Sequence, residues 1–187
     1  MVVQPRNSGW IEVICGPMFS GKTEELIRRI RRAEIAKQSV QVFKPEIDAR
    51  YSKSDIVSHS AQRALASAVA SSSRIVELLQ PESQVIGIDE AQFFDGKLVS
   101  VVEHLAGEGK RVIVAGLDTD FRVQPFEPIP ALMATADYVT KLLAICIQCG
   151  DPANRTQRLQ GGTNRVEVGA QDRYEARCRR CFVPFEG

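Results

Sequence analysis

The chain has 187 residues, of which 44% are hydrophobic and 25% charged, and its formal net charge is +1. This length suits one main domain with a small appendage, and a core that needs no disulfides. The near-neutral charge argues against a protein that mainly grips nucleic acid or a membrane surface, because such proteins carry a large basic excess. No apolar run approaches the roughly 18 residues of a membrane span, and residues 1–9 lack the apolar stretch of a signal peptide. We therefore expect a cytoplasmic protein with neither a membrane nor a nucleic acid as its partner.

The first half of the chain alternates between strand and helix patterns. A buried strand is expected at Trp10–Cys15, a helix at 22–38 and a second strand at 39–43. In the helix, one side is expected to carry the apolar residues Leu26, Ile27, Ile30, Ala33 and Ile35. Residues 44–60 are polar and aperiodic, which predicts a long surface loop.

The second half continues the alternation as far as residue 145. Residues 64–70 are an ambiguous strand, and the serines at 71–73 can cap a short helix that runs to residue 79. Strands are expected at Val85–Ile88, 111–115 and 138–145, with a helix at 97–106. Strands that alternate with helices predict an α/β fold with a mainly parallel sheet.

A phosphate-binding loop is predicted between the first strand and the first helix. The segment GPMFSGKT matches the pattern G-x-x-x-x-G-K-[ST] and comprises Gly16, Pro17, Met18, Phe19, Ser20, Gly21, Lys22 and Thr23. Its glycines allow the backbone to approach the phosphates, and its amides lie at a helix N-terminus that favours anions. In such loops the lysine reaches the β- and γ-phosphates of ATP and the threonine hydroxyl ligates Mg²⁺.

Two carboxylates follow the strand at Val85–Ile88. Asp89 and Glu90 stand where an open α/β sheet binds its ligands, at the carboxyl end of a strand. Asp89 is expected beside the Mg²⁺ held by Thr23, and Glu90 can activate a nucleophile. Alone this pattern would describe a strand that meets solvent, but the phosphate loop upstream favours the functional interpretation.

Four cysteines form two pairs with metal-ligand spacing. They are Cys146, Cys149, Cys178 and Cys181. Two C-x-x-C pairs in a cytosolic chain indicate a structural, four-coordinate Zn²⁺ site, with a disulfide pair as the less favoured alternative. The metal would join the two ends of the polar segment 150–177, a natural lid. The fifth cysteine, Cys15, lies in an apolar strand and is expected to be a buried small hydrophobe.

These patterns divide the chain into three parts. Residues 1–9 form an N-terminal extension of unassigned role, residues 10–145 a P-loop kinase core, and residues 146–187 a small zinc-binding domain. His59 lies in the predicted loop, where a site role and a solvated position are equally open.

Together the motifs resemble one family, the type II thymidine kinases. The resemblance rests on GPMFSGKT, on Asp48-Ala49-Arg50, on IDEAQFF at 88–94, on LDTDF at 117–121, on the cysteine pairs and on VGAQDRY at 168–174, all in that family's order. It implies a RecA-like core with a zinc-bearing lasso domain, assembled as a homotetramer. The implied reaction moves the γ-phosphoryl group of ATP to the 5′-hydroxyl of deoxythymidine, with feedback inhibition by dTTP.

The resemblance also implies roles for single residues. Glu90 matches the general base, Arg50 and Lys22 assist phosphate handling, and Thr23 and Asp89 hold the magnesium ion. Ala91 and Gln92 join the phosphate loop, Asp89 and Glu90 around the nucleotide. Seven residues match the nucleoside pocket or the segment that closes over it: Met18, Phe93, Leu117, Phe121, Val168, Gly169 and Tyr174.

Two other functions share some of these features. A P-loop kinase for another nucleoside or small metabolite would have the same loop and carboxylates, and would differ around Phe121 and the lasso. A zinc-ribbon ATPase stimulated by nucleic acid would share the cysteines, although the net charge of +1 speaks against it.

Overall fold

The computed structural model describes residues 8–47, 55–57, 63–160, 165 and 173–184. Six residues named above therefore lie outside the described part of the chain: Asp48, Ala49, Arg50, His59, Val168 and Gly169. Among the described helices, none is long and apolar enough to cross a membrane.

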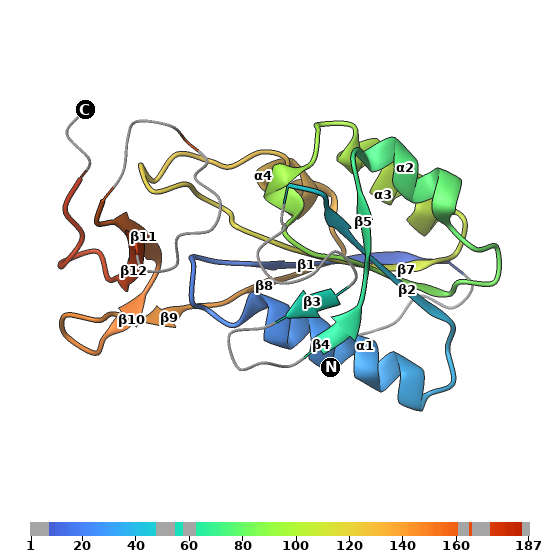
Figure 1. The fold of residues 1–187 in the computed structure, drawn as a ribbon, viewed down its shortest axis with the longest axis horizontal. Coiled ribbons are helices and arrows are strands. Elements are labelled where there is room, and N and C mark those ends of the chain that lie inside the picture. The colour runs from blue at the N-terminus through green and yellow to red at the C-terminus, as the bar shows by residue number, and fades with distance from the viewer. Residues whose placement is uncertain (1–7, 48–54, 58–62, 161–164, 166–172, 185–187) are drawn as a thin grey trace.

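The main body consists of a sheet flanked by helices (Figure 1). Its sheet strands are β1 (Trp10–Cys15), β2 (Val40–Pro45), β5 (Ser67–Val69), β6 (Val85–Ile88), β7 (Arg111–Gly116) and β8 (Tyr138–Lys141). Its helices are α1 (Lys22–Ile35), α2 (Ser72–Leu78), α3 (Leu98–Gly107) and α4 (Ile129–Thr135), with a 3₁₀ turn, η1, at Ala91–Phe93. A separate hairpin pairs β3 (Asp55–Val57) with β4 (Arg63–Leu65).

All pairings in the central sheet are parallel, and the strand order is β5-β2-β6-β7-β1-β8. The strand before the phosphate loop, β1, is separated from the carboxylate strand, β6, by β7. Both strands run in the same direction, so the phosphate loop and Asp89 emerge at the same edge of the sheet. The predicted RecA-like α/β fold with a mainly parallel sheet is confirmed.

Successive side chains along each strand point to opposite faces of the sheet, so each face has its own apolar core. On β1, Val13 and Cys15 join the core under α2, α3 and α4, whereas Ile14 joins the core under α1. Figure 1 shows α1 on one side of the sheet and the other three helices opposite. Because α1 starts directly after the phosphate loop, packing of its apolar face fixes the loop against the sheet.

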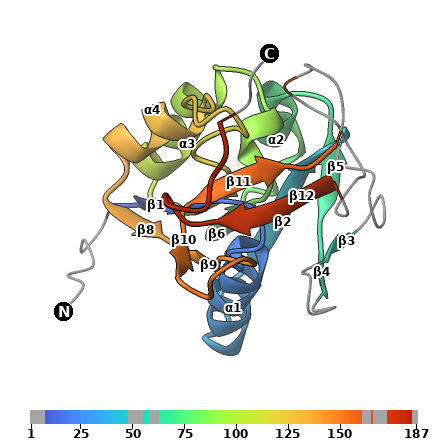
Figure 2. The same ribbon diagram turned by 90° about the vertical axis from the view of Figure 1, so that its left-hand side faces the viewer.

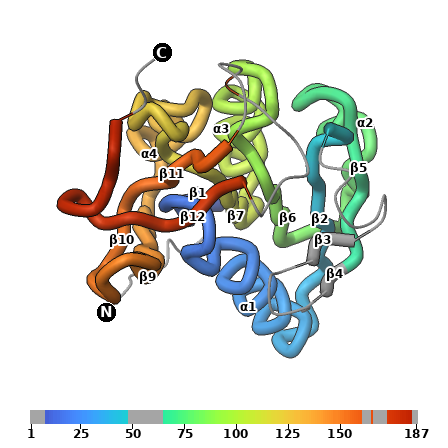
Figure 3. Tube along the Cα trace, turned by 60° about the vertical axis from the view of Figure 1, so that its left-hand side comes forward, coloured from blue at the N-terminus to red at the C-terminus, as the bar shows by residue number. Residues whose placement is uncertain are grey.

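The small lobe consists of four short strands near the C-terminus. Strand β9 (Ala144–Ile145) pairs with β10 (Pro152–Ala153), and β11 (Arg155–Arg158) pairs with β12 (Tyr174–Arg177). Its own apolar cluster consists of Ala144, Cys146, Ala153, Ala176 and Cys178. Figures 2 and 3 show that β11 and β12 lie across the end of the main body, in front of β1 and the start of α1.

Several predicted elements need correction. Ile35 is 81% exposed because it follows Leu26 by nine residues, about half a turn out of phase with the buried face. The predicted loop at 44–60 contains β3, which was missed because three residues are too few to show a period. The predicted strand 138–145 is two strands, because β8 pairs with β1 in the central sheet whereas β9 pairs with β10 in the small lobe.

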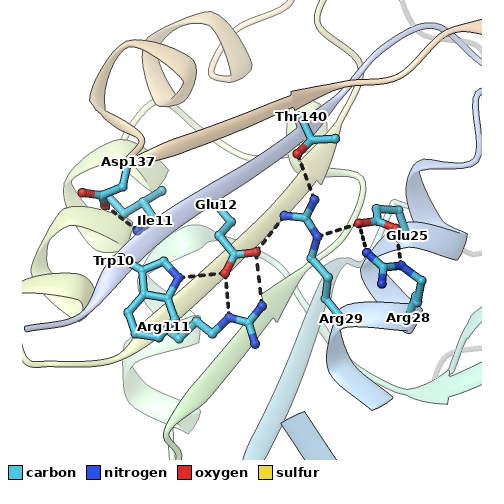
Figure 4. A network of polar contacts seen from close by, with 9 residues as sticks. All are labelled: Trp10, Ile11, Glu12, Glu25, Arg28, Arg29, Arg111, Asp137 and Thr140. Carbon is cyan, nitrogen blue, oxygen red and sulfur yellow. Dashed lines mark hydrogen bonds and ion pairs between the residues drawn. The ribbon is translucent and has the colours of Figure 1, made fainter. Parts of the chain in front are cut away.

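A buried carboxylate ties β1, α1 and β7 together below the phosphate loop (Figure 4). Glu12 accepts hydrogen bonds from Arg111 (2.6 Å), Arg29 (2.7 Å) and the Trp10 indole (2.7 Å), and Arg29 also donates to Thr140 of β8 at 2.9 Å. Burial alone would raise the pKa of Glu12, but the hydrogen bonds from Arg111 and Trp10 and the charges of both arginines outweigh it. The pKa is therefore lowered from 4.5.

We expect Glu12→Gln to lower the free energy of unfolding by about 2–4 kcal/mol at pH 7, because two partly buried guanidinium groups lose their carboxylate. Since the folded state depresses the pKa of Glu12, its contribution is complete above about pH 5 and is lost as the pH falls through the folded pKa. Urea denaturation of both proteins between pH 7 and pH 3 measures this difference, with the exposed Glu103→Gln variant as control. If the difference in unfolding free energy between the wild type and Glu12→Gln is as large at pH 3 as at pH 7, this role of the Glu12 carboxylate is contradicted.

Candidate active site

The phosphate loop occupies the predicted turn between β1 and α1. Gly16 has a φ of 145°, and a Cβ there would lie 2.4 Å from the carbonyl oxygen of Leu142, so only glycine fits. Gly21 takes a left-handed conformation, with φ 81°, at the start of α1. The helix N-terminus therefore opens into the loop, as anion binding requires.

Lys22 points back into this loop. Its ammonium donates to the carbonyl of Pro17 at 2.7 Å, and the Ser20 hydroxyl donates to the same oxygen at 2.8 Å. Burial lowers the pKa of Lys22 from its ordinary value, while the carboxylates of Glu90 and Asp89 act in the opposite direction. The cation thus faces both the loop and the two acidic residues that follow β6.

Thr23 and Asp89 meet across the sheet edge, as predicted. The Thr23 hydroxyl lies 3.1 Å from Asp89 Oδ2 and 3.4 Å from Oδ1, and Asp89 is buried, with only 5% of its surface exposed. A hydroxyl and a carboxylate beside a phosphate loop are the oxygen ligands that Mg²⁺ takes when it binds with a nucleotide. The donor set therefore fits the magnesium ion of MgATP.

Glu90 is held by a short chain of hydrogen bonds. Its Oε2 accepts from the Gln92 amide at 2.5 Å, and Gln92 Oε1 accepts from the backbone amide of Leu117 at 3.0 Å. Gln92 is 3% exposed, and a Cβ on Gly116 would lie 2.8 Å from its Oε1, so the glycine at the end of β7 leaves room for it. Gln92 therefore connects the carboxylate to the neighbouring strand.

The backbone at Glu90 is also unusual. Its φ of 49° and ψ of 40° lie in the left-handed region, which costs a residue with a side chain about 1–2 kcal/mol. Such conformations concentrate at functional sites, where the surrounding structure enforces them. Here the strain turns the chain out of β6 directly into η1.

An aromatic cluster of Phe121, Arg158 and Tyr174 joins the main body to the small lobe. Phe121 is 3% exposed, and the guanidinium of Arg158 from β11 lies 3.6 Å from the centroid of its ring. The same guanidinium donates to the Tyr174 hydroxyl at 2.5 and 3.0 Å. The predicted pocket residues Phe121 and Tyr174 are thus brought together through an arginine that the sequence did not single out.

Other predicted pocket residues stand around this group. Met18, Phe93 and Leu117 are each partly exposed, and the Phe93 ring meets the Phe126 ring edge-on, with centroids 6.1 Å apart. Met18 comes from the phosphate loop, Phe93 from η1 and Leu117 from the end of β7. Gln92 connects Leu117 to Glu90, and the Met18 amide bonds to Thr156 of the small lobe.

Two further acidic side chains follow β7 and were not assigned from the sequence. Asp118 is buried and forms an ion pair with Lys141 at 2.7 Å. Asp120 pairs with Arg165 at 2.9 Å and accepts from the amides of Arg122 and Gln124 at 2.9 Å. Their only signal in the sequence is two aspartates after an apolar strand.

The four paired cysteines converge in the small lobe. Their sulfur atoms all lie within 4.8 Å of one another, and Cys149 Sγ lies 3.6 Å from Cys178 Sγ. Four thiolates around one zinc, each about 2.3 Å from the metal, would stand about 3.8 Å apart. The cluster fits a structural Zn²⁺ and leaves no ligand position open for catalysis. Cys15, in contrast, is fully buried in the main core, and burial raises its pKa to about 11.

Comparison with known proteins agrees with this geometry. The family model for thymidine kinase matches residues 9–182. A thymidine kinase from Rhodothermus sp. (strain ITI 518) is 61% identical over 176 residues, which cover 94% of this chain and 82% of the relative. The match of the family model spans the phosphate loop, the carboxylates after β6, Phe121 with Tyr174, and all four clustered cysteines. This chain belongs to the thymidine kinase family.

Proposed function

We propose that this protein transfers the γ-phosphoryl group of ATP to the 5′-hydroxyl of deoxythymidine, which yields dTMP and ADP. The observation that supports the proposal is Glu90, a carboxylate that Gln92 holds in place directly after Asp89, which meets Thr23. In the proposed complex the nucleotide with its metal binds on the side of Thr23 and Asp89, and the base of the nucleoside binds near Phe121. This arrangement suits transfer to a hydroxyl.

On the donor side, the residues position charge. The amides of the phosphate loop and Lys22 hold the β- and γ-phosphates, and Thr23 and Asp89 hold the magnesium ion that accompanies ATP. Arg50 adds a second cation in this proposal. Such groups act mainly by neutralising and aligning the phosphates, because phosphoryl transfer needs little covalent help from the protein.

On the acceptor side, Glu90 takes the proton from the 5′-hydroxyl as the oxygen attacks phosphorus. Gln92 keeps the carboxylate aimed at that position through its two hydrogen bonds. Phe121, Met18, Phe93 and Leu117 contact the base. Tyr174, with Val168 and Gly169 in the segment before it, closes over the nucleoside and excludes water, which would otherwise hydrolyse ATP.

The main body and the small lobe are expected to have different roles. We propose that residues 10–145 act as the kinase core and that residues 146–187 act as the zinc-held lid domain, with residues 1–9 as an extension. The four cysteines hold the base of the lid, because the lobe's apolar cluster is made of small residues only. A structural metal compensates for so small a core.

We also propose a homotetramer in the cytoplasm, where reduced thiols suit a Cys₄ site. The tetramer is the assembly that the family resemblance implies, and size-exclusion chromatography with light scattering tests it. Feedback by dTTP follows from the same site, since that molecule carries both the thymine of the acceptor and the triphosphate of the donor.

A competition experiment tests the choice of acceptor. Purified protein with ATP and Mg²⁺ is given equal concentrations of deoxythymidine, deoxycytidine and deoxyguanosine, and the monophosphates are separated by chromatography. We expect dTMP to be the main product. If deoxycytidine or deoxyguanosine is phosphorylated as fast as deoxythymidine, the assignment of substrate is wrong and another nucleoside kinase activity replaces it.

A further inference from the structure

The phosphate loop is fastened to the small lobe through a backbone amide. The amide of Met18, in the middle of the loop, donates a hydrogen bond to the Thr156 hydroxyl of β11 at 3.0 Å. Thr156 is 4% exposed and its side chain lies on the inner face of β11. A loop amide that could point at an anion is thus committed to the lobe.

The next residue of the loop strengthens this connection. Phe19 has a φ of 65°, a left-handed conformation that a phenylalanine rarely adopts without support. Its side chain packs against the apolar cluster of the lobe, which contains Cys146 and Cys178. The lobe therefore holds both the hydrogen bond at Met18 and the unusual backbone at Phe19.

We propose that Thr156 is a positioning residue for the phosphate loop, and that through it the placement of the small lobe sets the affinity of the donor site. When the lobe is in place, the Met18 amide is held and the loop has the shape that receives the phosphates. When the lobe moves away, the amide loses its acceptor and the loop relaxes.

The small lobe also links the donor site to the acceptor site. The lobe also carries Tyr174 and Arg158, which stand over Phe121. A nucleoside that favours the closed lobe must then raise the affinity for the nucleotide, because coupling between two sites is reciprocal. This second part rests on the proposed function, whereas the link between Thr156 and the loop does not.

Three variants separate this role from a general loss of lobe structure. Thr156→Val keeps the shape of the side chain but removes the acceptor, and Thr156→Ser keeps the hydroxyl. Gln157→Ala is the matched control, because Gln157 is the next residue on β11 and its side chain bonds, among the residues that the structure describes, to Arg158 and Val183 of the same lobe. Zinc content and thermal unfolding of each full-length variant verify that the lobe is intact.

The measurement is the Kd of the non-hydrolysable analogue AMPPNP with Mg²⁺, by calorimetry, with and without deoxythymidine. We expect Thr156→Val to weaken AMPPNP binding about tenfold, because the free loop relaxes without this hydrogen bond and must be reordered when the nucleotide binds. Thr156→Ser and Gln157→Ala should stay within about twofold of the wild type. In the wild type, deoxythymidine should tighten AMPPNP binding, and Thr156→Val should lose that effect.

Two outcomes would overturn the proposal: an unchanged Kd in Thr156→Val, or an equal loss in Gln157→Ala. If deoxythymidine does not change AMPPNP binding in the wild type, coupling to the acceptor is refuted. The difference between the Val and Ser variants then still decides the role of Thr156 in the loop, so failure of the proposed function is distinguished from failure of this inference.

Discussion

Replacing Glu90 with glutamine should lower kcat for dTMP formation by a factor of about 10² to 10⁴, the range that a general base contributes. The amide cannot take the proton of the 5′-hydroxyl, but it has nearly the size of the carboxylate. It can still accept the hydrogen bond from Gln92, whose other end is fixed by the Leu117 amide. The pocket should therefore keep its shape.

In the Glu90→Gln variant, kcat should fall while the affinity for the nucleotide stays nearly unchanged. The Kd of AMPPNP is expected to change by less than about threefold, because the loop, Lys22, Thr23 and Asp89 are untouched. Asp89→Asn provides the contrast, since it alters the carboxylate next to Thr23 and should weaken binding of the magnesium nucleotide. Glu103→Gln, on the exposed face of α3, is the matched control. A Glu90→Gln enzyme with more than about a tenth of wild-type kcat would rule out the role of Glu90 as the base.

The second large effect is expected at the cysteine cluster. Cys178→Ser should reduce the zinc content from about one ion per chain to a small fraction, because three thiolates bind the metal far more weakly than four. The lobe's apolar cluster consists of alanine and cysteine side chains and cannot fold the lobe by burial alone. We therefore expect loss of activity together with rapid proteolysis in the lobe.

Elemental analysis and limited proteolysis measure these two results directly. Cys15→Ala is the matched control, because Cys15 is buried in the main core away from the cluster and should leave the zinc content unchanged. A wild-type protein without zinc, or one with the four cysteines in disulfides, would refute the structural metal. Full zinc content in Cys178→Ser would show that Cys178 is not a ligand.

The sequence predicted best where local pattern and global fold agree. The strand Trp10–Cys15, the loop that follows it and the strand Val85–Ile88 were placed correctly, because short apolar runs end in residues with a specific chemical use. Contact between Thr23 and Asp89 also followed from pattern, since parallel strands bring their carboxyl ends to one edge. The convergence of the four cysteines followed from their spacing.

Helix α4 shows one reason why other elements were missed. It carries a proline at 128, just before its first residue, and another at 130, and two prolines usually indicate a break. Both prolines stand at the start of the helix, where a backbone amide would have no acceptor within the helix, so they are compatible with that position. The sequence pattern alone does not show whether a proline starts a helix or breaks one.

The small lobe shows a second reason. Strand β11 buries Thr156 and Arg158, two polar residues, so its alternation cannot be seen on a hydropathy scale. Their burial depends on partners elsewhere in the chain: the Met18 amide for the threonine, and Phe121 and Tyr174 for the arginine. Such contacts between the lobe and the core appear only when the fold brings the two together.

The central claim is that this protein moves a phosphoryl group to deoxythymidine rather than to water. The direct measurement is ³¹P NMR of a reaction with ATP, Mg²⁺ and deoxythymidine, which resolves dTMP from inorganic phosphate. We expect dTMP and ADP to form in equal amounts, with almost no inorganic phosphate and no stimulation by added DNA or RNA. Inorganic phosphate as the main product, released faster when nucleic acid is added and with no dTMP, would contradict it.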